Sequence, residues 1–190
     1  MKYVTIEKQG RIAIVRFDRG FAANALSIEL LRELTEVARS FDNDFETSAV
    51  ILTGRPDHFT MGADLKDTEM AAIREAGLAE RRLGLMTGAR MCRAWEEIQA
   101  LTISAMEGWC VGGGVALSVA TDLRIIGKSS GMYVPEIERG MKMSWGSVPR
   151  ITNLVGPARA KRIVILAEKI MADRAVDWGF ADEAVADGTT

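Results

Sequence analysis

Short apolar segments with the length of strands alternate with amphipathic segments of helical period along most of this chain. Residues 49–52 and 101–106 predict buried strands, and Ser27 precedes a run whose apolar residues recur every three or four positions as far as Phe41. This alternation is typical of α/β proteins in which helices cover a mostly parallel sheet. The 190 residues suffice for one domain, and we expect a single domain over residues 1–190.

The remaining elements follow from local patterns. Two alternating segments flank Gln9-Gly10 and predict a β-hairpin. Pro56 and Gly62 mark a loop, after which Asp64 is expected to begin a helix as its N-cap. We further expect a long helix over 69–99, a glycine turn over 108–114 leading to a helix over 115–120, strands over 122–126 and 131–134, and helices over 157–167 and 172–178.

Composition excludes several classes of function. Twenty-four basic and 26 acidic residues give a net charge of −2, so no basic excess calls for nucleic acid or an anionic membrane. No apolar stretch approaches the ~20 residues of a membrane-spanning helix, and the N-terminus lacks a signal-peptide pattern. Two cysteines and a single histidine, His58, lack the spacing of a metal site. We expect a cytoplasmic, metal-free protein with reduced thiols.

The triplet Gly112-Gly113-Gly114 lies between a predicted strand and a predicted helix. Glycines let the backbone approach a ligand closely, and the first N–H groups of a helix point outward unpaired. Such a turn suits an anion, either a phosphate or an oxyanion. The alternative is a tight turn or close helix packing without a ligand.

Two further segments carry chemistry. The segment 61–66, Met-Gly-Ala-Asp-Leu-Lys, is a second loop that enters a helix and can supply another outward N–H. Pro135-Glu136 places a carboxylate directly after a strand-like stretch, where its alternative role is an exposed loop residue or an ion pair.

A different interpretation centres on Cys110. The segment 108–112, Gly-Trp-Cys-Val-Gly, matches a nucleophile elbow with cysteine in the serine position. A thiol hydrolase of this kind needs a basic partner, and His58 is the only histidine available. The alternative is a small buried thiol in a glycine-rich turn.

In their order along the chain, these motifs resemble those of the crotonase (enoyl-CoA hydratase/isomerase) superfamily. The segments that carry the resemblance are 24–27 (Asn-Ala-Leu-Ser), 50–54 (Val-Ile-Leu-Thr-Gly), 59–66 (Phe-Thr-Met-Gly-Ala-Asp-Leu-Lys), Gly108 with 112–114, 122–125 (Asp-Leu-Arg-Ile), 135–137 (Pro-Glu-Ile), 155–161 and 175–179 (Ala-Val-Asp-Trp-Gly). Each motif is weak by itself, but the ordered set spans nearly the whole chain.

The resemblance implies a ββα superhelical core and activity on acyl-CoA thioesters, as in fatty acid metabolism, with coenzyme A as part of the substrate and no other cofactor. It implies an oxyanion hole formed by the backbone N–H groups of Ala63 and Gly113, with Glu136 as the catalytic acid/base. It further implies assembly as a homotrimer or hexamer. The positions expected to contact substrate or coenzyme A are Ala25, Leu26, Gly62, Asp64, Leu65, Lys66, Gly112, Gly114, Ala116 and Trp145.

The chain also departs from the family pattern. Hydratases of the family use two glutamates, and Ala116 stands where the first is expected, so Glu136 has no carboxylate partner. A lone glutamate favours double-bond isomerisation, with hydration as its rival. Relatives also continue into C-terminal helices beyond the position of Thr190, so we expect this chain to be either a fragment or a short member of the family. Both departures permit a second interpretation, a non-catalytic subunit kept for assembly or binding.

Overall fold

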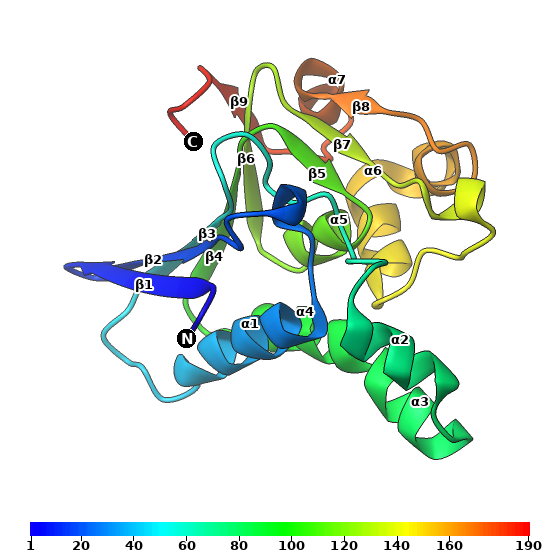
Figure 1. The fold of residues 1–190 in the computed structure, drawn as a ribbon. Helices are drawn as coiled ribbons and strands as arrows, with labels where there is room; N and C mark the ends of the chain where they lie inside the picture. The colour runs from blue at the N-terminus through cyan, green and yellow to red at the C-terminus, as the bar shows by residue number, and fades with distance from the viewer.

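The computed structural model describes residues 1–190 as two β-sheets covered by helices (Figure 1). The strands are β1 Val4–Gln9, β2 Ile12–Phe17, β3 Ala49–Thr53, β4 Leu101–Met106, β5 Trp109–Val111, β6 Leu123–Gly127, β7 Gly131–Tyr133, β8 Ile170–Met171 and β9 Glu183–Val185. The helices are α1 Ile28–Ser40, α2 Thr68–Glu75, α3 Leu78–Leu85, α4 Thr87–Glu96, α5 Gly113–Ser118, α6 Ser147–Val164 and α7 Ala172–Asp177, with the 3-10 helices η1 Ala22–Asn24 and η2 Glu136–Arg139.

The larger sheet has the strand order β1-β2-β3-β4-β6-β9. Only its first pair, β1 with β2, is antiparallel, and every later pair is parallel. The smaller sheet has the order β5-β7-β8, with β5 parallel to β7. The predicted α/β class with mostly parallel pairing is confirmed.

Local signals at the N-terminal end of the chain predicted the structure well. The hairpin forms around Gly10, which has φ +60°. The Ser27 hydroxyl accepts a hydrogen bond from the Leu30 N–H at 3.2 Å and so caps α1, as predicted. The apolar stripe of α1 is buried and packs against α4, where the Trp95 indole N–H donates to the Leu34 carbonyl at 3.2 Å.

The single long helix expected over 69–99 is wrong. The segment forms three helices, α2, α3 and α4, with breaks at Ala76-Gly77 and at Met86. Neither α2 nor α3 contains a buried residue, whereas α4 buries five, including Trp95. A continuous helix would have no apolar stripe in contact with the core over its first half. In Figure 1, α2 and α3 accordingly extend away from the sheets.

Other boundaries also differ from the predictions. Asp67, not Asp64, is the N-cap before α2, because it directly precedes the helix and its side chain accepts a hydrogen bond from the Glu69 N–H. The predicted helix after Pro157 exists, but it continues a helical segment that begins at Ser147, with a break at Gly156 (φ +77°). The predicted glycine turn contains β5, and two short strands, β8 and β9, were not predicted.

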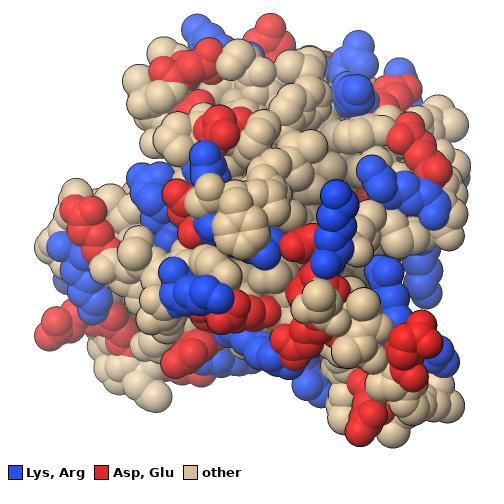
Figure 2. Space-filling model, in the orientation of Figure 1, with Lys and Arg blue, Asp and Glu red and all other residues tan.

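The distribution of charge on the surface and the apolar character of the helices agree with what the composition predicted. Figure 2 shows Lys and Arg interspersed with Asp and Glu on the visible face, without a large patch of one sign. None of the helices has both the length and the apolar character required to cross a bilayer.

Candidate active site

The Ala63 amide is presented by a β-bridge between two loops. The Leu26 N–H donates to the Gly62 carbonyl at 2.7 Å, and the Asp64 N–H donates to the Leu26 carbonyl at 2.9 Å. In a parallel bridge, the residue between the two bonded positions turns its own N–H away from the partner strand. Ala63 is that residue, and its N–H has no acceptor within the protein. The amide is therefore free to bind a ligand atom.

The turn between β5 and α5 brings a second amide to the same place. Gly112 has φ +49° and ψ −108°, a backbone conformation that residues with a side chain rarely adopt. It redirects the chain so that Gly113 becomes the first residue of α5, where backbone N–H groups have no acceptor within the helix. A Cβ atom on Gly113 would lie only 3.4 Å from the Ala63 nitrogen. The two amides therefore border one space.

The Glu136 carboxylate lies beside this turn. Glu136 begins η2 immediately after Pro135, and its Oε1 is 2.6 Å from the position that a Cβ on Gly112 would take. Its Oε2 is buried and has no hydrogen-bond partner. Burial raises the pKa of Glu136 above its ordinary value, while a hydrogen bond from its own backbone and the charge of Arg139 lower it by less. The carboxyl group is therefore suited to exchange a proton.

Two adjoining cavities meet at these groups. The larger has a volume of about 580 Å³ and the smaller about 200 Å³, and Ala63 and Glu136 line both. Eleven of the 18 residues around the larger cavity are hydrophobic, and Glu136 is the only acidic one. An apolar ligand group with one polar, reacting centre fits such a space.

Trp145 and Ala116 form part of the wall of the larger cavity. The Trp145 ring packs closely on Gly88 and Gly113. A Cβ on Gly88 would lie 2.0 Å from the ring, and a Cβ on Gly113 would lie 2.6 Å from it. Trp145 itself has φ +58°, which is uncommon for a large side chain. Ala116, on α5, is 1% exposed and presents only a methyl group.

The other predicted positions separate into two groups. Leu65 lines both cavities, and Gly62 and Gly112 line the smaller one. Outside the lining of both cavities lie Ala25, Leu26, Asp64, Lys66 and Gly114. The backbone of Leu26 nevertheless forms the bridge to Ala63, and the Asp64 carboxylate binds Arg19 at 2.7 Å.

Two other acidic residues, Glu138 and Glu107, form hydrogen bonds of their own, although Glu138 also lines the smaller cavity. Glu138 accepts a hydrogen bond from the Tyr133 hydroxyl and lies in a 3-10 turn, not an extended segment. Glu107 accepts from the N–H groups of Gly188 and Thr190 at the end of the chain.

The nucleophile-elbow interpretation of Cys110 does not fit the structure. An elbow requires the nucleophile to be exposed on a sharp turn. Cys110 instead lies within β5 and is fully buried, and its nearest polar partner is the Ser118 hydroxyl at 3.9 Å. Burial raises the pKa of the Cys110 thiol to about 12, so it is not a thiolate at neutral pH.

Much of the cavity wall was not predicted from the sequence. Met70, Met86, Met141 and Met143 line the larger cavity, and methionine is a flexible side chain that adapts to irregular apolar ligands. These residues come from α2, the α3–α4 junction and the loop after η2, which are far apart in sequence. Only the folded arrangement brings them together.

Comparisons with known proteins point to one family. Residues 7–189 match the family model described as enoyl-CoA hydratase/isomerase. The chain is 32% identical over 183 residues to a short-chain-enoyl-CoA hydratase of Clostridium acetobutylicum, covering 96% of this chain and 68% of that protein. It is 30% identical over 183 residues to a crotonyl-CoA hydratase of Syntrophomonas wolfei, again covering 96% and 68%. An enoyl-CoA hydratase structure from Bacillus anthracis matches with a TM-score of 0.88 at 26% identity, over 97% of this chain and 70% of that one.

Proposed function

The chain belongs to the enoyl-CoA hydratase/isomerase family, and from that premise we propose that it acts on an acyl-CoA thioester through a stabilised enolate. The crotonase fold expected from the order of the motifs is confirmed by the structural matches. The two free amides beside a half-buried carboxylate, whose Oε2 atom is shielded from solvent, carry the proposal. Assembly as a homotrimer or hexamer and a cytoplasmic location stay predictions.

The amides of Ala63 and Gly113 are proposed to bind the thioester oxygen. Removing a proton from the carbon next to the thioester carbonyl moves negative charge onto that oxygen. Two fixed N–H donors stabilise this charge more than they stabilise the neutral carbonyl, and losing one such donor typically costs about 3–4 kcal/mol. The apolar cavity strengthens the effect because little water competes for the oxygen.

Glu136 is proposed to move the proton. As a carboxylate it accepts a proton from one carbon of the enoyl chain, and the electron pair moves into the dienolate. The resulting carboxylic acid returns the proton to a carbon two positions away, which shifts the double bond and regenerates the carboxylate. No other reactant is consumed, and one carboxyl group suffices.

Isomerisation is favoured over hydration by one observation. Hydration adds a water that must be both oriented and deprotonated, and Ala116 offers no group for this, while Glu136 is the only acid lining the larger cavity. Hydration stays the second candidate because the relatives in the comparison are named hydratases.

A substrate panel tests the proposal. The protein is incubated with enoyl-CoA thioesters that differ in chain length and double-bond position, and the products are separated by retention and weighed by mass spectrometry. Isomerisation leaves the mass unchanged, whereas hydration adds one water. Acyl-CoA binding by calorimetry without turnover of any thioester would instead favour a binding or assembly subunit.

Gly112→Ala is expected to lower turnover by about 100-fold, because small displacements of a reacting group are costly. The new Cβ would lie 2.6 Å from the Glu136 carboxylate, which must move aside. Gly10→Ala is the matched control, since Gly10 also has a positive φ but nothing within 4 Å of its Cβ position. Equal turnover in the two variants would contradict the placement of Glu136.

Cys110→Ser is expected to retain turnover of acyl-CoA thioesters, because the thiol is buried outside both cavities. Steady-state rates on the best substrate of the panel measure this. A loss of activity in a variant that still melts cooperatively would revive the thiol hydrolase interpretation.

A further inference from the structure

Arg19 is a buried charged residue for which the proposed chemistry has no direct use. Its side chain is 8% exposed, and that of its partner Asp64 is 13% exposed. Charged groups are rarely withdrawn from water this far unless they are paired and hydrogen-bonded. Neither residue lines either of the two cavities at the candidate site, so a contact with the substrate does not explain them.

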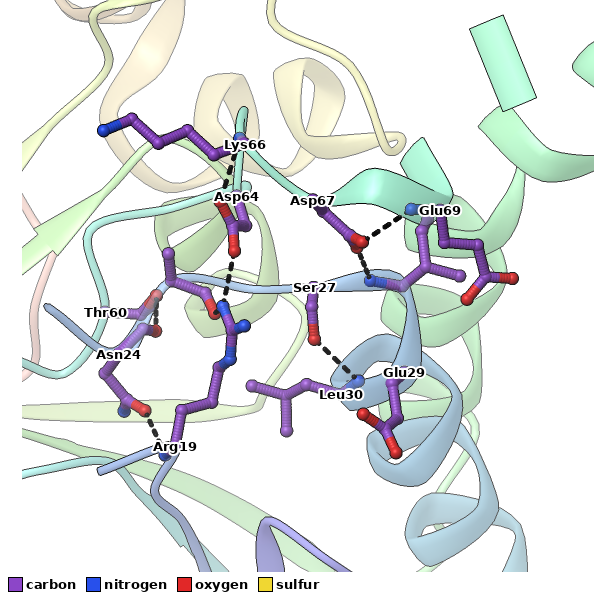
Figure 3. Close-up of polar contacts among 12 residues, drawn as sticks. Arg19, Asn24, Ser27, Glu29, Leu30, Thr60, Asp64, Lys66, Asp67 and Glu69 are labelled. Carbon is purple, nitrogen blue, oxygen red and sulfur yellow. Dashed lines mark hydrogen bonds and ion pairs between the residues drawn. The ribbon is translucent and has the colours of Figure 1, made fainter. Parts of the chain in front are cut away.

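One nitrogen of Arg19 joins the two loops that form the bridge at Ala63. Its Nη1 donates to the Ala25 carbonyl at 2.8 Å and to the Asp64 carboxylate at 2.7 Å. Ala25 directly precedes Leu26, and Asp64 directly follows Ala63. Figure 3 shows the Arg19 side chain reaching Asp64 from the neighbouring loop. Arg19 therefore ties together the two segments whose backbone pairing sets the direction of the Ala63 N–H.

Asp64 is held as a carboxylate in this position. Burial alone raises its pKa, but hydrogen bonds from Arg19 and from the Lys66 N–H outweigh that effect and leave the pKa below its ordinary value. The ion pair is thus present throughout the neutral pH range.

The loop to which Arg19 is hydrogen-bonded has a strained backbone. Ala22, Ala23 and Asn24 have φ values of +52°, +48° and +54°, three left-handed residues in a row. Such conformations persist only where the surroundings enforce them, and they cluster at functional sites. Here the Arg19 N–H donates to the Asn24 side chain at 3.0 Å, and the Thr60 hydroxyl donates to the Asn24 carbonyl at 2.6 Å (Figure 3).

The side chain of Asn24 also holds the strained loop in place. It is fully buried, and its amide group donates to the carbonyls of Phe17 and Phe59 at 3.1 Å and 2.9 Å. The strained loop is therefore fixed both to the end of β2 and to the segment that leads into Gly62 and Ala63.

We propose that Arg19 is a positioning residue that sets the direction of the Ala63 amide by clamping Ala25 to Asp64. The proposal rests on the proposed function of that amide as an oxyanion donor. Without the clamp, the bridge between Leu26 and Ala63 loosens and the N–H no longer points steadily at the thioester oxygen.

The test compares Arg19→Met, Arg19→Lys and Asp64→Asn with the unaltered protein. We expect kcat to fall by about 100-fold in Arg19→Met, since donor misplacement affects the transition state most, and KM to change little. Arg19→Lys and Asp64→Asn each keep part of the contact and should give intermediate losses. Arg39→Met is the matched control, because Arg39 forms an exposed pair with Glu97 on the α1–α4 face.

A spectroscopic measurement separates positioning from a general loss of stability. Butyryl-CoA, which has no double bond to move, is labelled at the carbonyl carbon, and its carbonyl stretch is recorded free and bound. Binding to the unaltered protein should lower the frequency because the amides polarise the carbonyl. Arg19→Met, or Arg19→Lys if the first variant does not fold, should return the frequency toward the free value, whereas Arg39→Met should not.

The outcomes distinguish the two proposals. If bound butyryl-CoA shows no frequency shift in the unaltered protein, the oxyanion role of Ala63 fails. If the shift is present there and persists in full in the folded Arg19 and Asp64 variants, the oxyanion role stands and the positioning role of Arg19 is overturned.

Discussion

Glu136→Gln is expected to reduce turnover by about 100-fold to 10,000-fold and to leave the affinity for acyl-CoA nearly unchanged. The range is that expected for losing a positioned general acid/base. Glutamine has nearly the same shape as glutamate but accepts no proton from carbon. Calorimetry with butyryl-CoA measures the affinity, and the rate of double-bond movement measures turnover.

Two further measurements make this prediction decisive. Glu183→Gln, which removes a carboxylate from the exposed first residue of β9, is the control and should keep full turnover. Exchange of solvent deuterium into the substrate reports proton removal even when no net product forms, and it should be lost in Glu136→Gln only. Rapid exchange in that variant would assign the base to another residue.

Because the pKa of Glu136 is raised, both the activity of the protein and the effect of Glu136→Gln on its stability should depend on pH. Because the base must be ionised, kcat/KM of the unaltered protein should fall as the pH drops through a value above the ordinary glutamate pKa of about 4.3. The stability of the fold also depends on this group, because folding favours the neutral form of Glu136. The stabilisation by protonated Glu136 is present at low pH and is lost as the pH rises through the folded-state pKa of Glu136.

Glutamine is neutral at every pH, so the effect of the substitution on stability depends on pH. Glu136→Gln should increase the free energy of unfolding at neutral pH, and this gain should shrink toward pH ~4, where glutamate is protonated as well. Urea titrations at the two pH values measure the difference. A variant less stable than the unaltered protein at neutral pH would mean that the carboxylate makes a favourable contact.

Ala116→Glu is expected to raise the rate of hydration by about 100-fold, the lower end of what a positioned acid/base supplies. Ala116 lines the same cavity as Glu136, so a second carboxylate there would face the reacting chain. Two carboxyl groups close together do not both ionise readily, so the pair can hold one proton and one negative charge. That is the state needed to deprotonate water and to protonate carbon.

Ala116→Gln is the control for size, since it fills the same space but exchanges no proton. Hydrated product is quantified by its added mass, and the isomerised product is measured in the same run. If the unaltered protein hydrates its substrate as fast as Ala116→Glu, the single-carboxylate interpretation is wrong.

The sequence predicted those parts of the fold that depend on near neighbours. The cap at Ser27, the hairpin around Gly10 and the strand over 101–106 each depend on residues within one turn or one strand. The long helix over 69–99 failed because nothing in the core stabilises its first half, and its first break falls at Gly77, a residue type that weakens helices. The break at Met86 has no such local signal and depends on how α4 packs on the core.

The site divides in the same way. Local patterns, a carboxylate after a strand and a glycine triplet before a helix, made Glu136 and the glycine turn candidates, but their expected roles came from the resemblance to the family. Arg19 was not predicted, because an arginine in a loop has no local signature of burial. Its role depends on Asp64, which lies far along the chain, and that residue was itself expected to cap a helix.

The bridge between Leu26 and Ala63 also bears on how such a protein can diverge. Since both proposed donors belong to the main chain, they depend on the bridge at Ala63 and on the glycine turn before α5 and not on a particular functional side chain. The two relatives share 30–32% identity with this chain, so most positions differ between them. Under the proposed role of the two amides, such differences leave the donors in place wherever the bridge and the glycine turn are kept. On this proposal, a change of reaction needs only a carboxyl group gained, lost or moved beside the same two amides.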